Sequence, residues 1–184
     1  MLKELAEHAD IAAFLGDQYE PVRVQIDSNI IHYNFGDWYG IDHLGGYLAS
    51  LTANVYRVFA STRVKMMYAT NFYIGKQPIR PDQVEVFTSR SGVKVYRNPG
   101  AFPRAWTVHD ALTIKHDGEI APLLEAASFD ARRQTFVNGT PPELEKCQAE
   151  ETVSLLERQS SRVLLEANLK CRGMVIVADT FFPG

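Results

Sequence analysis

Apolar residues recur at helical spacing in two stretches of the first third of the chain. Over Met1–Leu15 they fall three or four residues apart, and Gly16 follows where helices commonly end, so the pattern predicts a helix with one buried stripe. The same spacing continues for longer over Leu44–Ala60, with Asp42 or His43 near the N-terminal cap. Both stretches are therefore expected to be helices.

The pattern changes to that of strands on either side of the second helix. Val22–Asp27 alternates apolar and polar residues, and Val64–Tyr73 is a run of β-branched and aromatic residues. A strand, a long helix and a returning strand predict one right-handed βαβ crossover. Two further strands, Val84–Thr88 and Val93–Arg97, are separated by the turn residues Ser89–Gly92 and predict an antiparallel hairpin.

The middle of the chain carries shorter patterns. Ala105–Leu112 is expected to be extended, Pro122 can open a short helix through Ala127, and Arg133–Val137 fits one more strand. Asn138–Pro142 reads NGTPP, a composition typical of a linker.

Period-two alternation marks the last part of the chain. Glu151–Arg158 and Arg162–Leu169 predict a hairpin with one buried face. Met174–Ala178 is apolar on both faces, so we expect a further sheet to cover it, yet the sequence stops soon afterwards. We therefore expect a sandwich that is cut short, with an exposed edge on its last strand, and a homodimer in which a second copy covers that strand.

Together these elements predict an α+β fold with two domains. Residues 1–137 are expected to form a mixed α/β layer with one βαβ crossover and a hairpin. Residues 138–146 are the expected linker, and residues 147–184 are expected to form part of an antiparallel β-sandwich.

Composition and charge narrow the classes of function. Of the 184 residues, 46% are apolar, which is enough for a buried core. The 19 basic and 22 acidic side chains argue against a nucleic-acid partner, because phosphate binding needs clustered Lys and Arg. No charge-free stretch approaches the roughly 20 apolar residues that cross a bilayer. The first ten residues also lack the apolar core of a signal peptide.

Six segments occur in the order and with the spacing of a known family. Val95–Val108 reads VYRNPGAFPRAWTV and is similar to the vYeN-x-x-alPRaf-V stretch of the YfhO-like bacterial membrane proteins. These are multi-span proteins grouped with lipid-linked-sugar glycosyltransferases. The other similar segments are Pro21–Val24, Gly40–Tyr47, Phe129–Arg132, Ser160–Glu166 and Val175–Gly184.

The resemblance implies a location and a scaffold. It places the chain in the extracytoplasmic C-terminal region of such a protein, on the outer face of the bacterial cell membrane, with the parent chain embedded in that membrane. In the family, a Trp and several more strands follow the segment that resembles Phe181–Gly184, and the membrane helices and the loop linked to glycosyl transfer lie before this region. The resemblance therefore implies a non-catalytic domain, a scaffold or a weak contact for a glycan or another envelope component.

Short motifs of common enzyme chemistry are missing from the sequence. It holds no G-x-S-x-G, G-x-x-x-x-G-K-[ST], G-x-G-x-x-G or H-E-x-x-H. It also lacks the Asp-x-Asp pair with which many nucleotide-sugar transferases hold a divalent ion. We therefore expect no catalytic residue, no cofactor and no metal site.

One loop nevertheless combines aromatic and polar side chains as sugar-binding sites do, by stacking on the sugar and bonding its hydroxyls. An alternative function for the same loop is a small hydrolase that uses Asp37 and His43 as acid and base. A purely structural alternative packs the loop over the sheet, with Asp42 and His43 as helix caps. The candidate ligand-binding residues are Asn34, Asp37, Trp38, Tyr39 and His43.

Two dipeptides, His109-Asp110 and His116-Asp117, pair an imidazole with a carboxylate in sequence. Adjacent residues of a strand point to opposite faces, so these dipeptides make poor catalytic pairs. We interpret them as surface or strand-end residues.

The two cysteines, Cys147 and Cys171, each lie twelve residues from Gln159, the centre of the predicted turn. A regular hairpin would bring them opposite each other, near the separation that a disulfide needs. An oxidising extracytoplasmic space would allow that bridge, whereas a slip of one residue in register would leave two free thiols. The sequence leaves both alternatives open.

Overall fold

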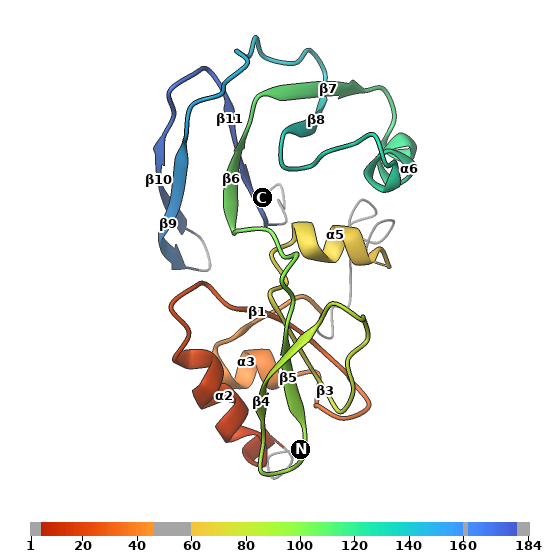
Figure 1. Cartoon of the computed structure of the whole chain (residues 1–184), viewed down its shortest axis with the longest axis vertical. Helices are drawn as coiled ribbons and strands as arrows, with labels where there is room; N and C mark the ends of the chain where they lie inside the picture. Colours follow the sequence, from red (N-terminus) through yellow and green to blue (C-terminus); the bar gives the residue numbers. More distant parts are fainter. Residues whose placement is uncertain (1–4, 46–59, 160–161, 180–184) are drawn as a thin grey trace. The chain divides into compact units, whose positions relative to one another are not determined.

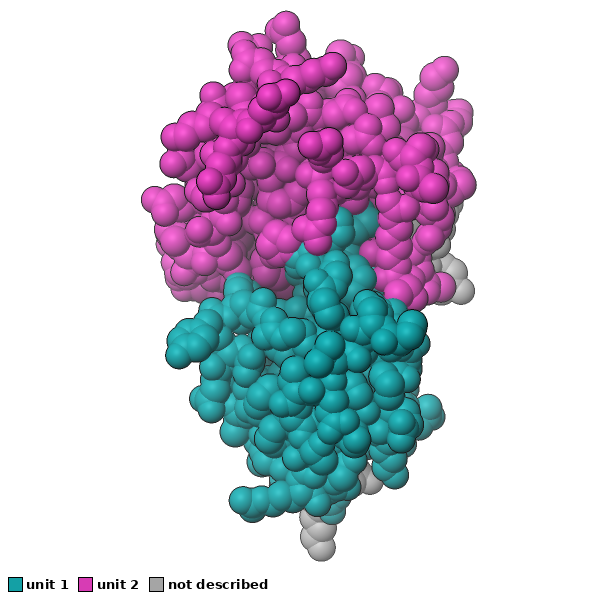
Figure 2. Space-filling model, viewed as in Figure 1, with its two compact units in different colours: residues 1–52, 65–102 teal, residues 53–64, 103–184 magenta. Residues whose placement is uncertain are grey.

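The computed structural model describes residues 5–45, 60–159 and 162–179. The chain divides into two compact units, unit 1 with residues 1–52 and 65–102, and unit 2 with residues 53–64 and 103–184 (Figure 2). The division differs from the expected boundary at residues 138–146, because strands on both sides of those residues pair with each other in unit 2. The helices and the mixed and antiparallel strands confirm the predicted α+β class.

A five-stranded mixed sheet forms the centre of unit 1 (Figure 1). Its strands lie in the order β2-β1-β3-β5-β4. Strand β1 is parallel to β2 and β3, and β5 is antiparallel to β3 and β4, so the predicted parallel return and hairpin are both present. The bounds are β1 Arg23–Ile26, β2 Asp42–His43, β3 Phe72–Gly75, β4 Val84–Thr88 and β5 Lys94–Arg97.

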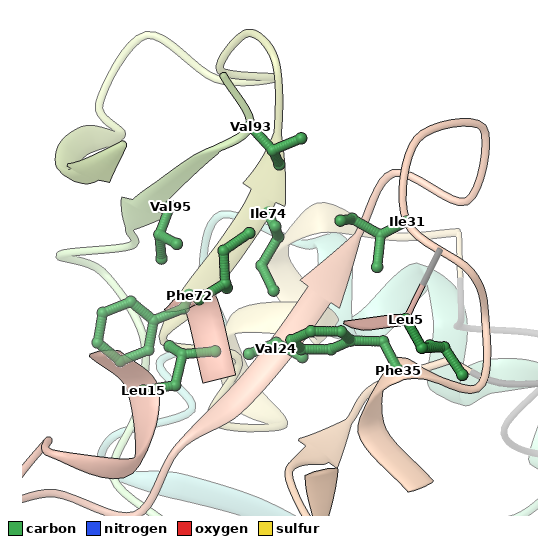
Figure 3. Packing of buried hydrophobic residues seen from close by; sticks show 10 residues of the cluster. Leu5, Leu15, Val24, Ile31, Phe35, Phe72, Ile74, Val93 and Val95 are labelled. Atoms are coloured by element: carbon green, nitrogen blue, oxygen red, sulfur yellow. The ribbon is translucent and has the colours of Figure 1, made fainter. Parts of the chain in front are cut away.

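Helix α2 (Ala9–Gly16) contributes its apolar stripe to the core of unit 1. Leu15 is buried in one cluster with Val24 of β1 and with Phe72 and Ile74 of β3 (Figure 3). Ile11 belongs to the same cluster. The apolar spacing at the start of the chain therefore marks the contact between this helix and the sheet. The helix is shorter than predicted, since residues 7 and 8 form a turn before it.

The predicted helix Leu44–Ala60 falls mostly on residues 46–59, which lie outside the described residues. Its expected cap is wrong, because Asp42 and His43 form the short strand β2. They pair in parallel with Arg23 and Val24 of β1, so they belong to the sheet and do not cap a helix.

The predicted strand Val64–Tyr73 is also wrong over its first half. Residues Thr62–Met67 form helix α5, and the strand begins only at Phe72. The Ser61 Oγ accepts a hydrogen bond from the Val64 N–H at 3.1 Å, which is the contact of a helix N-cap. Ala69, with a positive φ of 55°, ends the helical stretch before β3. The part of the predicted strand that is helical reads VKMM, in which only Val64 favours strands, so the N-cap and the helix formers Lys and Met decide the local structure.

The strands of unit 2 form three pairs (Figure 1). β6 pairs antiparallel with β11, β9 pairs antiparallel with β10, and β7 pairs in parallel with β8 through a connection that contains helix α6 (Ile120–Glu125). The bounds are β6 Ala105–Val108, β7 Asp110–Ile114, β8 Gln134–Asn138, β9 Thr152–Gln159, β10 Arg162–Asn168 and β11 Met174–Val177.

Among the described residues no helix is both long and apolar enough to cross a membrane.

The C-terminal hairpin is present as β9 and β10, and its predicted buried face is only partly buried. On the expected face, Val153, Leu155 and Leu165 are partly buried. Val163 of the same face is 40% exposed, and Ala167 is exposed as well. The register shifts between Leu164 and Leu165, so a strict period of two does not hold along the pair.

Strand β11 has a partner, contrary to the expectation that it lacks neighbours. Met174–Val177 pairs with Ala105–Val108 of β6, which covers one edge of the strand within the same chain. The homodimer therefore no longer follows from an unpaired strand, and it stays a prediction.

Asp10 of α2 holds the turn between β4 and β5. Its carboxylate accepts hydrogen bonds from the Ser89 hydroxyl (2.9 and 3.0 Å) and from the Arg90 N–H (2.9 Å). Partial burial acts to raise the Asp10 pKa, but the hydrogen bonds from Arg90, Ser89 and Ile11 outweigh it and the pKa lies below its usual value. The carboxylate therefore stabilises unit 1 in its ionised form.

Replacing Asp10 by Ala should lower the free energy of unfolding at neutral pH by about 1–3 kcal/mol, the usual cost of removing a charged acceptor from its donors. Because the folded pKa is depressed, the contribution is present above the unfolded pKa and is lost as the pH falls through the folded value. Urea unfolding at neutral and acidic pH measures both effects. Asp17→Ala, at the exposed C-terminal cap of the same helix, is the matched control. Equal losses in the two variants would contradict the assignment.

Candidate functional site

His109 lies at the corner between β6 and β7, with both of its ring nitrogens engaged. Nε2 is 2.8 Å from the Glu151 Oε2, and Nδ1 is 2.8 Å from the Glu145 carbonyl oxygen. Both neighbours are acceptors, so each nitrogen donates a proton and the ring is an imidazolium. The hydrogen bond to Glu151 is the main cause that raises the pKa of His109 above its usual value.

Glu151 stands directly before β9, with a side chain only 4% exposed. While its Oε2 faces His109, its Oε1 accepts hydrogen bonds from the Lys170 N–H (2.8 Å) and the Cys171 N–H (3.1 Å). The hydrogen bond from His109, followed by those from the two backbone groups, lowers the pKa of this carboxyl to about 2. The site therefore contains a buried carboxylate that stays ionised at physiological pH.

A disulfide joins Cys147 and Cys171 beside this carboxylate. Their Cα atoms are 5.7 Å apart, and the Cys147 Sγ lies 3.4 Å from the Glu151 Oε1. The bridge ties the segment before β9 to the segment after β10. Of the two alternatives that the sequence leaves open, the structure contains the bridge.

Gly173 forms the wall behind the imidazole. A Cβ atom at this position would lie 2.5 Å from the His109 Cε1, closer than real side chains approach. The absence of a side chain at residue 173 is therefore what leaves room for the ring against Glu151.

A cavity of about 650 Å³ opens beside the His109–Glu151 pair, within unit 2. Its walls carry side chains of both charges, and the neutral Gln134 already binds one of them, since its Nε2 donates to the Asp110 Oδ2 at 2.7 Å. A cavity of this size and polarity suits a small polar ligand. Among the residues that line it are His109, Asp110, Asp130, Arg132, Gln134 and Glu151.

The sequence-predicted binding residues lie elsewhere, in unit 1. Asn34 precedes the short helix α3 (Phe35–Tyr39), which carries Asp37, Trp38 and Tyr39, and His43 belongs to the neighbouring strand β2. The structure therefore gathers these residues into one small region, as the clustering in the sequence suggests.

Only part of that region faces solvent. Asp37 is exposed and Trp38 is 54% exposed. Tyr39 turns inward, because its hydroxyl donates to the Leu5 carbonyl at 2.7 Å. His43 is partly buried, and burial lowers its pKa despite the opposing influence of Asp37. Trp38 and Asp37 are thus the members of the predicted set that are best placed to meet a ligand.

The dipeptide His109-Asp110 does not form a bonded pair of side chains. His109 stands at a strand end as expected, but its carboxylate partner is Glu151, 42 residues away, rather than Asp110. His116 is exposed after β7. In the sequence, only the cysteines on either side of Glu151 and the glycine at position 173 point to the region of the His109–Glu151 pair. Neither feature identifies His109 unless the pairing of the strands is already known.

Comparison with known proteins finds no relative of this chain. No family model matches the chain, and neither a curated protein nor a solved structure matches it. The similarity to the YfhO-like proteins therefore stays a prediction.

Opening the disulfide should destabilise unit 2. Its cysteines are 24 residues apart, and a crosslink closing a loop of that length contributes about 3–4 kcal/mol. Urea unfolding of the protein with and without a thiol reductant, followed by a signal from unit 2, measures the loss. The double variant Cys147→Ser with Cys171→Ser should match the reduced wild type and should not respond to reductant. A reduced protein with two titratable thiols and an unchanged midpoint would contradict this prediction.

Replacing Gly173 by Ala should displace His109 from Glu151, because the new Cβ would collide with the ring. The His109 pKa should then fall toward the ordinary value of about 6.5, which NMR titration of the imidazole protons measures. Since a raised pKa stabilises below the unfolded value and its effect is lost as pH rises, the stability loss should be largest below pH about 6.5. Gly118→Ala, with no atom near the added carbon, is the control. An unchanged His109 titration would show that the ring does not depend on this glycine.

Proposed function

We propose that this chain serves as a non-catalytic extracytoplasmic domain of a larger, membrane-embedded, glycosyltransferase-like protein. The observation that carries the proposal is the Cys147–Cys171 disulfide, which joins two residues of unit 2 that are 24 positions apart in the sequence. Structural disulfides persist in oxidising compartments outside the cytosol and are rare inside it. The bridge and the similarity of Val95–Val108 to the YfhO-like proteins support the same location independently.

The bonding of His109 supports a scaffold role over catalysis. A general base needs a nitrogen lone pair, and both nitrogens of this imidazolium donate to Glu145 and Glu151. Glu151 is likewise occupied by the backbone N–H groups of Lys170 and Cys171. The pair therefore fastens three segments of unit 2 together.

Helix α3 supports a weak contact with a glycan of the cell envelope. Trp38 presents an indole that is 54% exposed, and the exposed carboxylate of Asp37 is its neighbour in the helix. An aromatic face and a nearby acceptor are the groups with which proteins hold a sugar ring and its hydroxyls.

Export from the cytosol should increase the yield of native, disulfide-bonded protein. Fused to a secretion signal, the chain should accumulate as a protease-resistant, disulfide-bonded form, whereas the same chain kept in the cytosol should be reduced and cleaved more readily. Limited proteolysis with thiol trapping measures both forms. The Cys147→Ser, Cys171→Ser variant is the control and should gain nothing from export. Equal resistance of exported and cytosolic wild type would contradict the proposed location.

Glycan contact is tested by NMR titration with short soluble oligosaccharides of hexoses and N-acetylhexosamines. Shifts should centre on α3, and Trp38→Ala should abolish them, while Tyr19→Ala, which removes another fully exposed aromatic, should not. Absence of shifts at millimolar sugar would remove the glycan contact from the proposal. Hydrolysis of an oligosaccharide that is lost in Asp37→Asn and His43→Gln would instead support the hydrolase alternative.

A further inference from the structure

We propose that reduction of the Cys147–Cys171 disulfide converts its surroundings into a binding site for a thiophilic divalent cation such as Zn²⁺. The ligands are the His109 Nε2, the Cys147 Sγ and a carboxylate oxygen of Glu151. The inference does not depend on the proposed function, since it concerns chemistry available to this cluster in either compartment.

The distances within the cluster suit one cation. The three ligand atoms all lie within 4.8 Å of one another. The Nε2 of His109 is 2.8 Å from the Oε2 of Glu151, and the Sγ of Cys147 is 3.4 Å from Oε1, the other oxygen of the same carboxylate. Tetrahedral zinc with bonds of about 2.0–2.3 Å places its ligand atoms roughly 3.3–3.7 Å apart. Side-chain shifts of up to about 1 Å would therefore bring the three ligand atoms to this spacing around an ion placed between His109 and Glu151.

His109 is already oriented as a metal ligand. Its Nδ1 donates to the Glu145 carbonyl at 2.8 Å, which aims Nε2 at Glu151 and Cys147. A histidine that binds a metal through one nitrogen commonly donates its other N–H to a carbonyl or carboxylate, which fixes the ring and raises its basicity. This outer contact is present without the ion.

Glu151 is held in the same way. The Lys170 and Cys171 N–H groups fix its Oε1, and its side chain is only 4% exposed. The carboxylate is ionised and does not need to be brought in from solvent. Two of the three ligands are therefore preorganised by backbone groups.

The sulfur supplies the redox dependence. A disulfide sulfur carries no charge and is a poor ligand, which leaves only two ligands in the oxidised protein. A dithiol reductant breaks the S–S bond, is itself oxidised to a disulfide, and leaves a thiol on Cys147 and on Cys171. The cation then binds the Cys147 thiolate and His109, and the thiol proton and the Nε2 proton pass to solvent.

The cavity gives the ion a way in. His109, Cys147 and Glu151 all line the space of about 650 Å³ described above. Three protein ligands and a fourth position open to water are the arrangement of accessible zinc sites. The site therefore differs from a closed structural zinc centre.

Zinc competition against a chromophoric chelator, with Co²⁺ absorption as a second readout, tests the proposal on the full chain. The reduced wild type should bind one Zn²⁺ and show a thiolate-to-cobalt charge-transfer band, whereas the oxidised wild type should bind at least about tenfold more weakly and lack the band. Glu151→Gln and His109→Gln should each weaken binding by the reduced protein to a similar degree.

Two single-cysteine variants separate the proposed ligand from its partner. Cys171→Ser leaves the Cys147 thiol free beside His109 and Glu151, so it should bind Zn²⁺ without prior opening of a disulfide. Cys147→Ser leaves only the thiol that is not in the three-residue cluster, so its affinity should fall to that of the oxidised wild type. Both are kept monomeric with a non-chelating phosphine and checked by circular dichroism.

Equal zinc affinity of the oxidised and reduced wild type would overturn the proposal. So would equal affinity of the two single-cysteine variants. If either variant is unfolded, the comparison of reduced wild type with reduced Glu151→Gln decides the question, and equal affinity there would likewise overturn it.

Discussion

The arrangement of unit 2 depends on one carboxylate. Beyond the last paired residues of β9 and β10, the side chain of Glu151 takes the place of a backbone acceptor and receives the N–H groups of Lys170 and Cys171. Its other oxygen binds His109, between β6 and β7, and the disulfide lies against it. Without Glu151, two backbone donors and an imidazolium would lose their acceptor together, and the cost would be greatest for the partly buried Cys171 N–H and His109.

Local patterns predicted much of the fold because their causes are local. The alternation in Val22–Asp27 marks β1, and the turn residues Ser89–Gly92 mark the hairpin of β4 and β5. The prediction failed at Val64–Met67, where the Ser61 hydroxyl caps a helix and Lys65, Met66 and Met67 favour helices. The parallel pairing of β7 with β8 was also missed, because the apolar and polar pattern of a strand does not indicate which other strand it will pair with.

The candidate site could not be predicted in the same way. The sequence singled out the cysteines by their symmetry about Gln159, and this pairing is the one in the structure. Nothing local connects His109 with Glu151, which meet only through the fold of unit 2 and the space left by Gly173. Conversely, the aromatic residues around α3 are close in sequence and in space, but the inward hydroxyl of Tyr39 shows that composition does not fix which groups face solvent.

The pairing of β6 with β11 has a consequence for synthesis on the ribosome. Unit 1 has all of its residues once residue 102 has been made, whereas the first strand of unit 2 must wait for Met174–Val177 to emerge. Domains generally fold as units, the N-terminal one first during synthesis. The backbone edge of β6 that pairs with β11 therefore lacks its partner for most of the translation of unit 2, and the oxidation of Cys147 is tied to the final stage, after Cys171 appears.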